Sequence, residues 1–250
     1  MPEITPTILY KHMQDFVEKD GVRLVFKHIW FDGEHAVATN THVLCAVKYK
    51  AEPHFETTDG TPAEPDMKFP AWGRLTIKDE EAEACVTLPS ETLDNLSDWV
   101  RLLKFIVQAT KKRGVKKSDQ YHVLGIRKQG RKLILYFLMA LSTTPVKVEL
   151  LDNLETGKDF QIFLNAEYLS NALSFIQDMG AETVDWLFRS TGMTELRAEE
   201  NNLRVVICGV RVKDSPDDDN HKLLKFIEED TLNNEPDEEE DEDDDLSFLD

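Results

Sequence analysis

The chain has 250 residues, of which 41% are hydrophobic, and this is enough for one large domain or two small ones with a real core. Its formal charge of −19 is unevenly spread, because residues 228–250 contain fourteen acids and no base, whereas residues 101–132 contain eleven bases and one acid. Three distant cysteines without CxxC spacing argue against a disulfide scaffold or zinc site, and no apolar run is long enough to cross a membrane, so we expect a soluble, cytoplasmic protein.

The first 50 residues predict a short strand, a helix and three strands. Apolar residues recur at helical spacing over residues 6–20, and Gly21 is suited to end that helix. The apolar runs on either side of Asp32-Gly33 predict a hairpin, since Asp-Gly is a frequent two-residue turn. Residues 51–68 hold three prolines and a glycine without an apolar period, which predicts a linker or long loop.

The same order of elements recurs after the loop. The segment "ACVTL" predicts a strand, and Ser90 is a plausible N-cap of a helix that extends to about Lys112. Three strands follow, "YHVLGIR", "KLILYFLMAL" and "VKVEL", with a turn at Gln129-Gly130 between the first two.

A third round begins with the strand "FQIFL". We expect its helix to be capped by Asn165 and ended by Gly180, and three strands to follow. The chain therefore predicts an α+β fold of about three βαβββ units, near residues 1–50, 82–150 and 159–212, with antiparallel sheets and the helices on one face. After about Asp214 we expect a loop, a short helix near "HKLLKFIEE" and a disordered acidic tail.

No catalytic motif is present in the sequence. The seven histidines form no HExxH, no Cys/His set has zinc spacing, and "GIRKQGR" has Arg131-Lys132 where a P-loop needs Lys followed by Ser or Thr. The clustered acids of the tail lack the glycine and alternating spacing of a calcium loop. We therefore expect no enzymatic activity, no metal and no cofactor.

Four segments resemble bacterial DNA polymerase III β subunits, the sliding clamps. "FDGEHAVATNTHVLCAV" (31–47) is similar to their strand pair with its Thr-Asp-Gly corner, and "FPAWGRLTI" (69–77) to their interdomain stretch. "FLNAEYLSNALSFI" (163–176) and "VVICGVRV" (205–212) are similar to segments of their last domain. The four occur in the family's order and at nearly its spacing, so the resemblance implies a DNA-clamp fold.

The resemblance also implies a shortened protein. A clamp domain is two βαβββ units, and the family's protomer has three domains. Residues 1–80 then look like half of a middle domain with a linker, residues 81–213 like a complete last domain, and residues 214–250 like a helix with a tail. Shortened clamp relatives occur in viruses and mobile elements, which is one origin that the resemblance allows.

Clamps have a peptide pocket between the middle and last domains, into which polymerases and repair factors insert motifs such as Gln-Leu-Ser-Leu-Phe. The resemblance implies the same pocket here. The alternative is that the matching residues are ordinary sheet-core, turn or surface residues. They are Thr39, His42, Leu44, Pro70, Arg74, Leu75, Ile207 and Cys208.

Clamps also line a central hole with helices whose Lys and Arg side chains meet DNA phosphates without reading bases. The resemblance implies such contacts for the second helix and the loop after it, although the first helix mixes both charges and the third has no basic residue. The alternative is a solvated basic face. The candidates are Arg101, Lys104, Lys111, Lys112, Arg113, Lys116 and Lys117.

The chain ends in Leu246, Phe248 and Leu249 after nine consecutive acids. The segment "DDLSFLD" is similar to the clamp-binding motif without its glutamine. Three interpretations stay open: the hook docks into a clamp pocket in the same chain, a neighbour or a host clamp; the tail only solubilises; or another replication protein captures it.

The leading interpretation is a sliding-clamp-like processivity factor, without enzymatic activity, that binds double-stranded DNA non-specifically and DNA polymerase or other clamp-binding proteins. We expect a homo-oligomer, because the lone N-terminal unit leaves a sheet edge unpaired. The main alternative is a decoy or inhibitor whose tail docks in a host clamp or replication protein, and an acidic-tailed histone-like chaperone is more distant.

Overall fold

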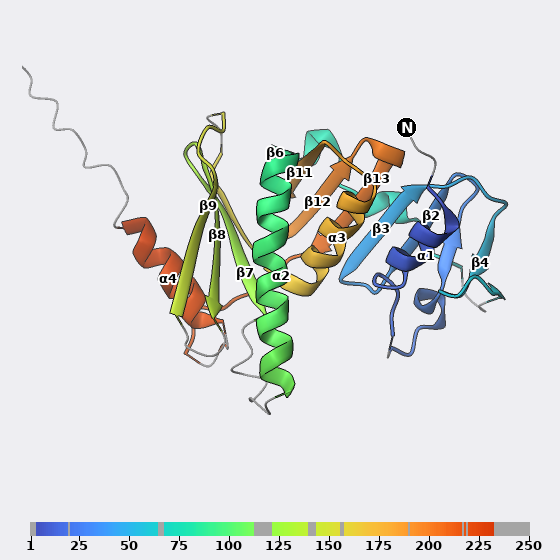
Figure 1. The fold of residues 1–250 in the computed structure, drawn as a ribbon, viewed down its shortest axis with the longest axis horizontal. Coiled ribbons are helices and arrows are strands. Elements are labelled where there is room, and N and C mark those ends of the chain that lie inside the picture. Colours follow the sequence, from blue (N-terminus) through green and yellow to red (C-terminus); the bar gives the residue numbers. More distant parts are fainter. Residues whose placement is uncertain are drawn as a thin grey trace, which may run out of the picture.

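The structure, a computed structural model, describes residues 4–19, 21–64, 68–112, 122–139, 144–155, 158–189, 191–216, 218 and 220–232. Two antiparallel sheets lie beside one another, and the first three helices, α1, α2 and α3, cover the same side of them (Figure 1). The helices are α1 (Pro6–Met13), α2 (Ser90–Lys112), α3 (Ala166–Asp178) and α4 (His221–Leu232), with 3-10 turns at Leu24–Lys27, Trp72–Arg74, Asp79–Glu81 and Glu200–Asn202.

The two sheets differ in size. The large sheet contains, in spatial order, β5 (Pro62–Ala63), β4 (His54–Glu56), β1 (Ile29–Phe31), β2 (His35–Thr39), β3 (Val43–Lys48), β13 (Leu203–Cys208), β12 (Met193–Ala198), β11 (Thr183–Arg189) and β6 (Ala84–Pro89). The small sheet contains β10 (Phe160–Asn165), β7 (Val123–Gln129), β8 (Lys132–Met139) and β9 (Thr144–Leu151).

The repeat predicted from the sequence is confirmed for the second and third units, and these two units exchange their first strands. In the first unit, the described residues before α1 do not form the predicted short strand. The order β6-α2-β7-β8-β9 recurs as β10-α3-β11-β12-β13. However, β6 pairs with β11 of the third unit, and β10 pairs with β7 of the second. Because each sheet is completed by a strand of the other unit, the two units form one domain. The first unit joins them through the pairing of β3 with β13.

Local sequence accounts for the two long helices. The apolar stripe of α2, including Leu96, Val100 and Leu103, is buried against the sheets, as its helical spacing predicts. The Asn165 side chain accepts a hydrogen bond from the Glu167 N–H at 2.8 Å and caps α3. Both helices therefore have the bounds that the sequence predicts.

The first helix is shorter than predicted. It ends at Met13, and the next residues form tight turns, in which the Phe16 N–H donates to the Met13 carbonyl. These turns still bury Phe16 and Val17 in the core. The prediction of a helix over residues 6–20 was wrong because turns can bury the same side chains.

Residues 51–68, predicted as a linker, contribute two strands. β4 pairs with β1, and the Trp30 and Phe55 rings lie 4.4 Å apart across that pair. β5 then pairs with β4. The predicted open edge of the N-terminal unit was therefore wrong, because this short hairpin covers it. Cross-strand aromatic contacts stabilise the pairing although the segment lacks an apolar period.

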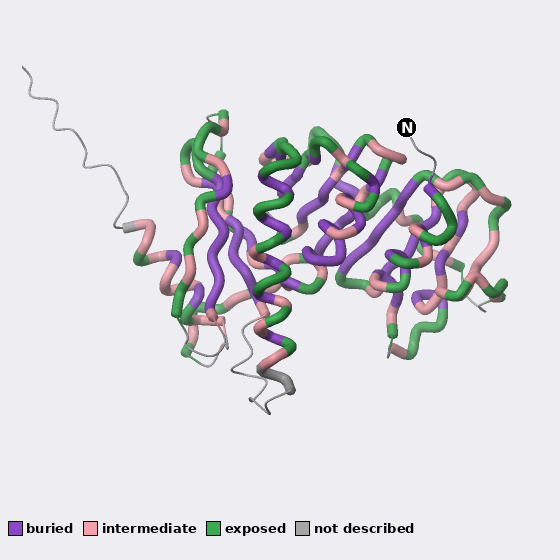
Figure 2. The backbone as a smooth tube through the Cα atoms, viewed as in Figure 1, coloured by how far each residue is buried: buried purple, intermediate pink, exposed green. Residues whose placement is uncertain are grey.

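The helix α4 lies on the opposite side of the small sheet from α2 (Figure 1). Its Leu223 and Ile227 pack against β8, whose backbone is buried between the two helices in Figure 2. At Gly125 an added Cβ would lie 2.8 Å from the Ile227 Cδ1, so the glycine permits this close approach. The helices of the repeated units lie on one face, as predicted, and α4, which was predicted as a short helix after these units, covers the other face of this sheet. The outward-facing β-strand residues of this contact are Val123, Ile134, Tyr136 and Leu138.

Candidate peptide pocket and helix surface

A hollow of about 190 Å³ lies where the first unit meets the third. Pro70 and Leu75, in the segment 69–77, form one of its walls. The sequence nominated eight residues for a peptide pocket, and the structure brings six of them together here. Their neighbours in the hollow come from β3, β12, β13, the β2–β3 corner and the 3-10 turn at Leu24–Lys27. The six are Thr39, His42, Leu44, Pro70, Leu75 and Cys208.

The other two nominated residues lie elsewhere. Ile207 is fully buried in the helix-covered core, while Val206 lines the hollow. Successive side chains of a strand point to opposite faces, so a one-residue difference moves the side chain from one face to the other. Placing Ile207 in the pocket was therefore wrong. Arg74 is exposed beside Leu75 and does not line the hollow.

Five lining residues were not nominated from the sequence. Three of them, Thr41, Val43 and Val206, adjoin nominated residues. The sequence had therefore identified the segments that contain them, which are the β2–β3 corner with the start of β3, and β13. Phe26 lies in a 3-10 turn and Met193 at the start of β12, and neither belongs to a segment with a recognisable motif. The full additional set is Phe26, Thr41, Val43, Met193 and Val206.

The corner between β2 and β3 forms a tight turn without the Asp-Gly of the clamp pattern. The Asn40 side chain accepts hydrogen bonds from the N–H groups of His42 and Val43, both at 3.0 Å. Thr41 has a φ of 75°, a conformation that glycine adopts more easily and that costs another residue about 1–2 kcal/mol. The Asn40 side chain thus accepts the hydrogen bonds that stabilise the turn, and Thr41 adopts its strained backbone conformation.

Two polar contacts hold the wall that contains Pro70 and Leu75. At one end, Trp72 Nε1 donates to Asp32 Oδ2 at 2.9 Å. Burial raises the pKa of Asp32, but hydrogen bonds from the Glu34 N–H, Trp72 and the His35 N–H outweigh it and lower the pKa overall. The carboxylate therefore stays ionised and accepts the Trp72 bond at neutral pH.

At the other end of this wall, the Ile77 N–H donates to Glu195 Oε2 at 2.5 Å. Glu195 is fully buried, and its other oxygen accepts from Arg197 Nε at 2.8 Å and lies 3.7 Å from Arg204 Nη1. A buried carboxylate with these partners has satisfied acceptors and a balanced charge. Glu195 therefore fixes the position of Ile77, at the end of the segment 69–77 that forms this wall of the pocket.

The lining is chemically suited to apolar side chains. Phe26, Leu44, Leu75, Met193 and Val206 supply a mostly aliphatic surface, and His42 and the threonines supply a few polar groups. Hollows of this composition bind apolar groups and use the polar groups for orientation. Leucine and phenylalanine side chains match the apolar lining, and the backbone of an extended peptide can contact the polar groups.

The helix surface has fewer free positive charges than the sequence suggested. Arg101 Nη2 donates to Gln177 Oε1 at 2.6 Å, and Lys104 Nζ donates to Asn171 Oδ1 at 3.0 Å, so both side chains lie toward α3. These two hydrogen bonds go to uncharged amides, and Arg101 Nη1 also lies 3.9 Å from Asp98 Oδ1, with which it forms an ion pair. Lys11 of α1 instead forms an ion pair with Asp178.

The other basic candidates are less completely placed. Lys111 and Lys112 are the last two residues of α2, and their side chains lie outside what the structure describes. Arg113, Lys116 and Lys117 also lie outside the described residues, as does the tail with Leu246, Phe248 and Leu249. The DNA and tail assignments therefore stay predictions.

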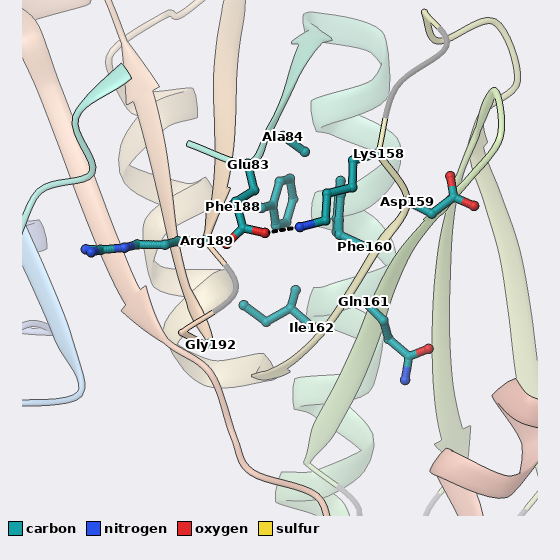
Figure 3. A pocket seen from close by; sticks show the side chains of 10 residues that line it. All are labelled: Glu83, Ala84, Lys158, Asp159, Phe160, Gln161, Ile162, Phe188, Arg189 and Gly192. Carbon is teal, nitrogen blue, oxygen red and sulfur yellow. Dashed lines mark hydrogen bonds and ion pairs between the residues drawn. The ribbon is translucent and has the colours of Figure 1, made fainter. Parts of the chain in front are cut away.

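A second hollow, of about 280 Å³, lies at the seam between the two sheets (Figure 3). Phe160 of β10 and Phe188 of β11 stack there, with ring centroids 3.7 Å apart. Lys158 and Glu83 form an ion pair beside the rings, as the dashed line in Figure 3 marks. Both charged groups are thus used to join the sheets, and we interpret this hollow as a structural seam.

Among the described residues, no group of three or more His, Cys, Asp and Glu side chains is arranged to hold a metal ion. None of the helices in the described ranges has both the length and the apolar character needed to span a membrane.

No sequence-family model and no curated protein sequence matches the chain. Solved structures do match. DNA polymerase III subunit beta from Borrelia burgdorferi aligns with a TM-score of 0.63 and 15% identity, covering 82% of this chain and 60% of that one. The beta sliding clamp of Caulobacter crescentus aligns with a TM-score of 0.62 and 14% identity, over 85% and 68% of the two chains.

The DNA polymerase sliding clamp of Bacillus subtilis aligns with a TM-score of 0.62 and 11% identity, covering 85% of this chain and 67% of that one. The fold is therefore that of the bacterial sliding clamps, as the resemblance implied. This chain spans about 60% of the length of the Borrelia protein.

Proposed function

We propose that this protein, which has the sliding-clamp fold, is a clamp-like DNA replication accessory factor that binds partner peptides in the hollow between its first and third units. The observation that carries the proposal is that six of eight residues nominated from sequence line one apolar hollow. Because the nominations came from separate segments, a shared location supports a common role. The proposed activity is binding, with no chemical step.

Replacing Leu75 by aspartate should weaken binding of a Gln-Leu-Ser-Leu-Phe peptide by at least about tenfold, equivalent to about 1.4 kcal/mol. Leu75 lines the hollow and is 43% exposed, so the new charge would face the bound peptide while the core stays intact. Fluorescence anisotropy with a labelled peptide measures the dissociation constant.

The matched control is Leu24→Asp. Leu24 is 56% exposed, does not line the hollow and undergoes the same chemical change. It should leave peptide affinity unchanged. Equal losses in the two variants, or no binding by the wild-type chain, would contradict the peptide-binding proposal.

The proposal includes non-specific contact with double-stranded DNA through the basic residues at the end of α2 and those that follow it in the sequence. Residues 101–132 have eleven basic and one acidic residue, and this density of charge favours phosphate contacts. The acidic tail, with eleven acids in residues 233–250, should compete with DNA for the same basic segment.

A chain that ends at residue 232 should therefore bind duplex DNA several-fold more tightly than the full chain at low salt. The cut keeps α4, whose Asp230 accepts a hydrogen bond from Tyr136 at 2.7 Å. The difference should shrink near physiological salt, where charges are screened beyond about 8 Å. Anisotropy with a labelled duplex at two salt concentrations measures it.

A full-length variant with its tail acids changed to Asn and Gln is the control, and it should behave like the shortened chain if charge is responsible. Equal DNA affinity of all three proteins at low salt would show that the tail does not compete with DNA for the basic segment.

The second candidate function is a decoy or inhibitor whose tail docks in a host clamp. The terminal segment "DDLSFLD" favours it, through its similarity to clamp-binding peptides. Binding to a host clamp that disappears on Phe248→Ala supports this function, whereas retention on circular DNA supports the accessory factor. If the tail instead occupies its own pocket, the chain that ends at residue 232 should bind added peptide more tightly.

A further inference from the structure

The side of α2 that is turned away from the core carries an exposed aromatic residue. The buried stripe of the helix includes Val100, Leu103 and Val107, whereas Phe105 is 69% exposed and Leu102 is 42% exposed. A phenylalanine this exposed contributes little to the hydrophobic core, because the stabilisation that it supplies scales with the apolar area removed from water. Its ring is therefore available to a ligand.

Phe105 lines an open hollow of about 350 Å³ between α2 and α3, which lie side by side over the sheets (Figure 1). From α3 the hollow receives Asn171 and two serines. Phe105 is the one aromatic ring among the described residues that line it, and the other side chains carry hydrogen-bonding or charged groups. The hollow is thus a polar site with a single flat apolar surface. The remaining residues of α2 in its lining are Arg101, Lys104 and Gln108.

The charges around the hollow favour an anionic ligand. The acid in its described lining, Asp15, lies 3.7 Å from Lys19 Nζ and is compensated by it. Arg101 pairs with Asp98, whereas Lys104 Nζ donates to the uncharged amide of Asn171. A positive charge therefore remains in the lining, and residues 101–132 as a whole have eleven bases and one acid. Such a surface attracts phosphate groups.

We propose that this hollow binds single-stranded DNA, with one unpaired base stacked on the Phe105 ring and its phosphate close to Arg101 and Lys104. Proteins bind single strands in this way, by combining base stacking on aromatic rings with basic groups along the backbone. The side-chain amides of Gln108 and Asn171 can exchange hydrogen bonds with the edge of the base. The inference rests on the DNA contact proposed above and deepens it, since it names a form of DNA and a site.

The aromatic ring is what distinguishes a single strand from a duplex at this site. In a duplex the faces of the bases are stacked on one another, so a side chain reaches them only by unstacking a base step. The phosphates of a duplex would meet Arg101 and Lys104, and those contacts do not need Phe105. The ring therefore adds affinity for the single strand that the basic residues alone do not provide.

A protein partner fits this surface less well. Among the described residues of α2, the exposed large apolar side chains are Leu102 and Phe105. A stable protein interface buries roughly 800 Å² on each partner and has an apolar centre. Two apolar side chains among charged and amide groups are too few for such a centre, whereas one ring is enough for one base.

The test compares binding of the full chain to a labelled single-stranded oligothymidylate and to a labelled blunt duplex, by fluorescence anisotropy at low salt. Phe105→Ala should weaken single-strand binding by at least about fivefold, the lower end of what stacking on one base contributes, and leave duplex binding unchanged. Phe105→Trp should keep the single-strand affinity, because it keeps a flat aromatic ring. Phe105→Leu keeps only an apolar side chain, so it should lose affinity as Phe105→Ala does.

Leu102→Ala is the matched control. Leu102 is exposed on the same helix but does not line the hollow, so its truncation should change neither affinity. Because Leu102 and Phe105 both lie outside the core, every variant should keep the circular dichroism spectrum and the unfolding temperature of the wild-type chain.

Three results overturn the inference: wild-type single-strand affinity in Phe105→Ala, equal affinities of Phe105→Leu and Phe105→Trp, or an equal loss of single-strand and duplex binding in Phe105→Ala. A wild-type chain that binds the duplex but not the single strand overturns this inference and leaves the proposed DNA contact standing. A chain that binds neither overturns both. Peptide binding, which uses the other hollow, is measured independently of all these outcomes.

Discussion

Shortening Ile227 to alanine should lower the free energy of unfolding by about 2–5 kcal/mol, the usual cost of emptying a buried aliphatic site. Ile227 is fully buried between α4 and the small sheet, where it packs with Leu223, Ile134 and Tyr136. Without this side chain, α4 loses a central contact with a sheet face that is otherwise apolar. Urea unfolding followed by circular dichroism measures the change.

Lys222→Ala is the control on the same helix. Lys222 is exposed and immediately precedes Leu223 of the buried face, and its replacement should change stability by less than about 0.5 kcal/mol. If Ile227→Ala is no more harmful than Lys222→Ala, α4 does not dock on the sheet as described. Complete removal of α4 should be more severe, since it uncovers Ile134, Tyr136 and Leu138 as one apolar patch that favours aggregation.

Replacing Glu195 by alanine should cost about 3 kcal/mol of stability and also weaken peptide binding. The variant leaves the Ile77 N–H without its acceptor and removes the partner of Arg197 and Arg204. Since Leu75 lies two residues before Ile77, the pocket wall should lose its fixed position. Thermal unfolding and peptide anisotropy measure the two effects.

Glu195→Gln separates the two contributions. It keeps an oxygen that can accept the Ile77 bond but removes the charge opposite the arginines, so it should lose stability while keeping most of the peptide affinity. Glu199→Ala, at an exposed position nearby, should change neither quantity. Wild-type peptide affinity in Glu195→Ala would show that this carboxylate does not position the wall.

Local features of the fold could be predicted from the sequence because their causes are local. The Asn165 cap and the Gly180 stop of α3 depend on residues within one turn of the helix ends. The turns at Asp32-Gly33 and Gln129-Gly130 depend on residues adjacent in the chain. Each of these was predicted correctly.

Features that depend on distant contacts were missed. The strands β4 and β5 are stabilised by an aromatic pair with β1, which no pattern within residues 51–68 reveals. The position of α4 depends on the outward face of β8, whose continuous apolar run "LILYFL" is compatible with burial on either or both faces. The exchange of β6 and β10 between units likewise leaves no local signal.

The candidate pocket was predicted through resemblance, and its errors have simple geometric causes. Ile207 was chosen in place of Val206, because a strand segment can be recognised without fixing which residues face which side. Phe26 and Met193 enter the hollow from segments that are far away in the chain. Their contribution depends on how the units are placed, which only the folded structure contains.

The pairing of β3 with β13 has a further consequence for how a peptide would be received. Leu44 lies opposite Val206 and Val43 opposite Ile207, so the floor of the hollow is a hydrogen-bonded ladder shared by the two units. The first and third units cannot separate by a hinge motion without breaking the hydrogen bonds between β3 and β13. A ligand would thus meet a preorganised surface, and little of its binding energy would be lost to rearranging the receptor backbone.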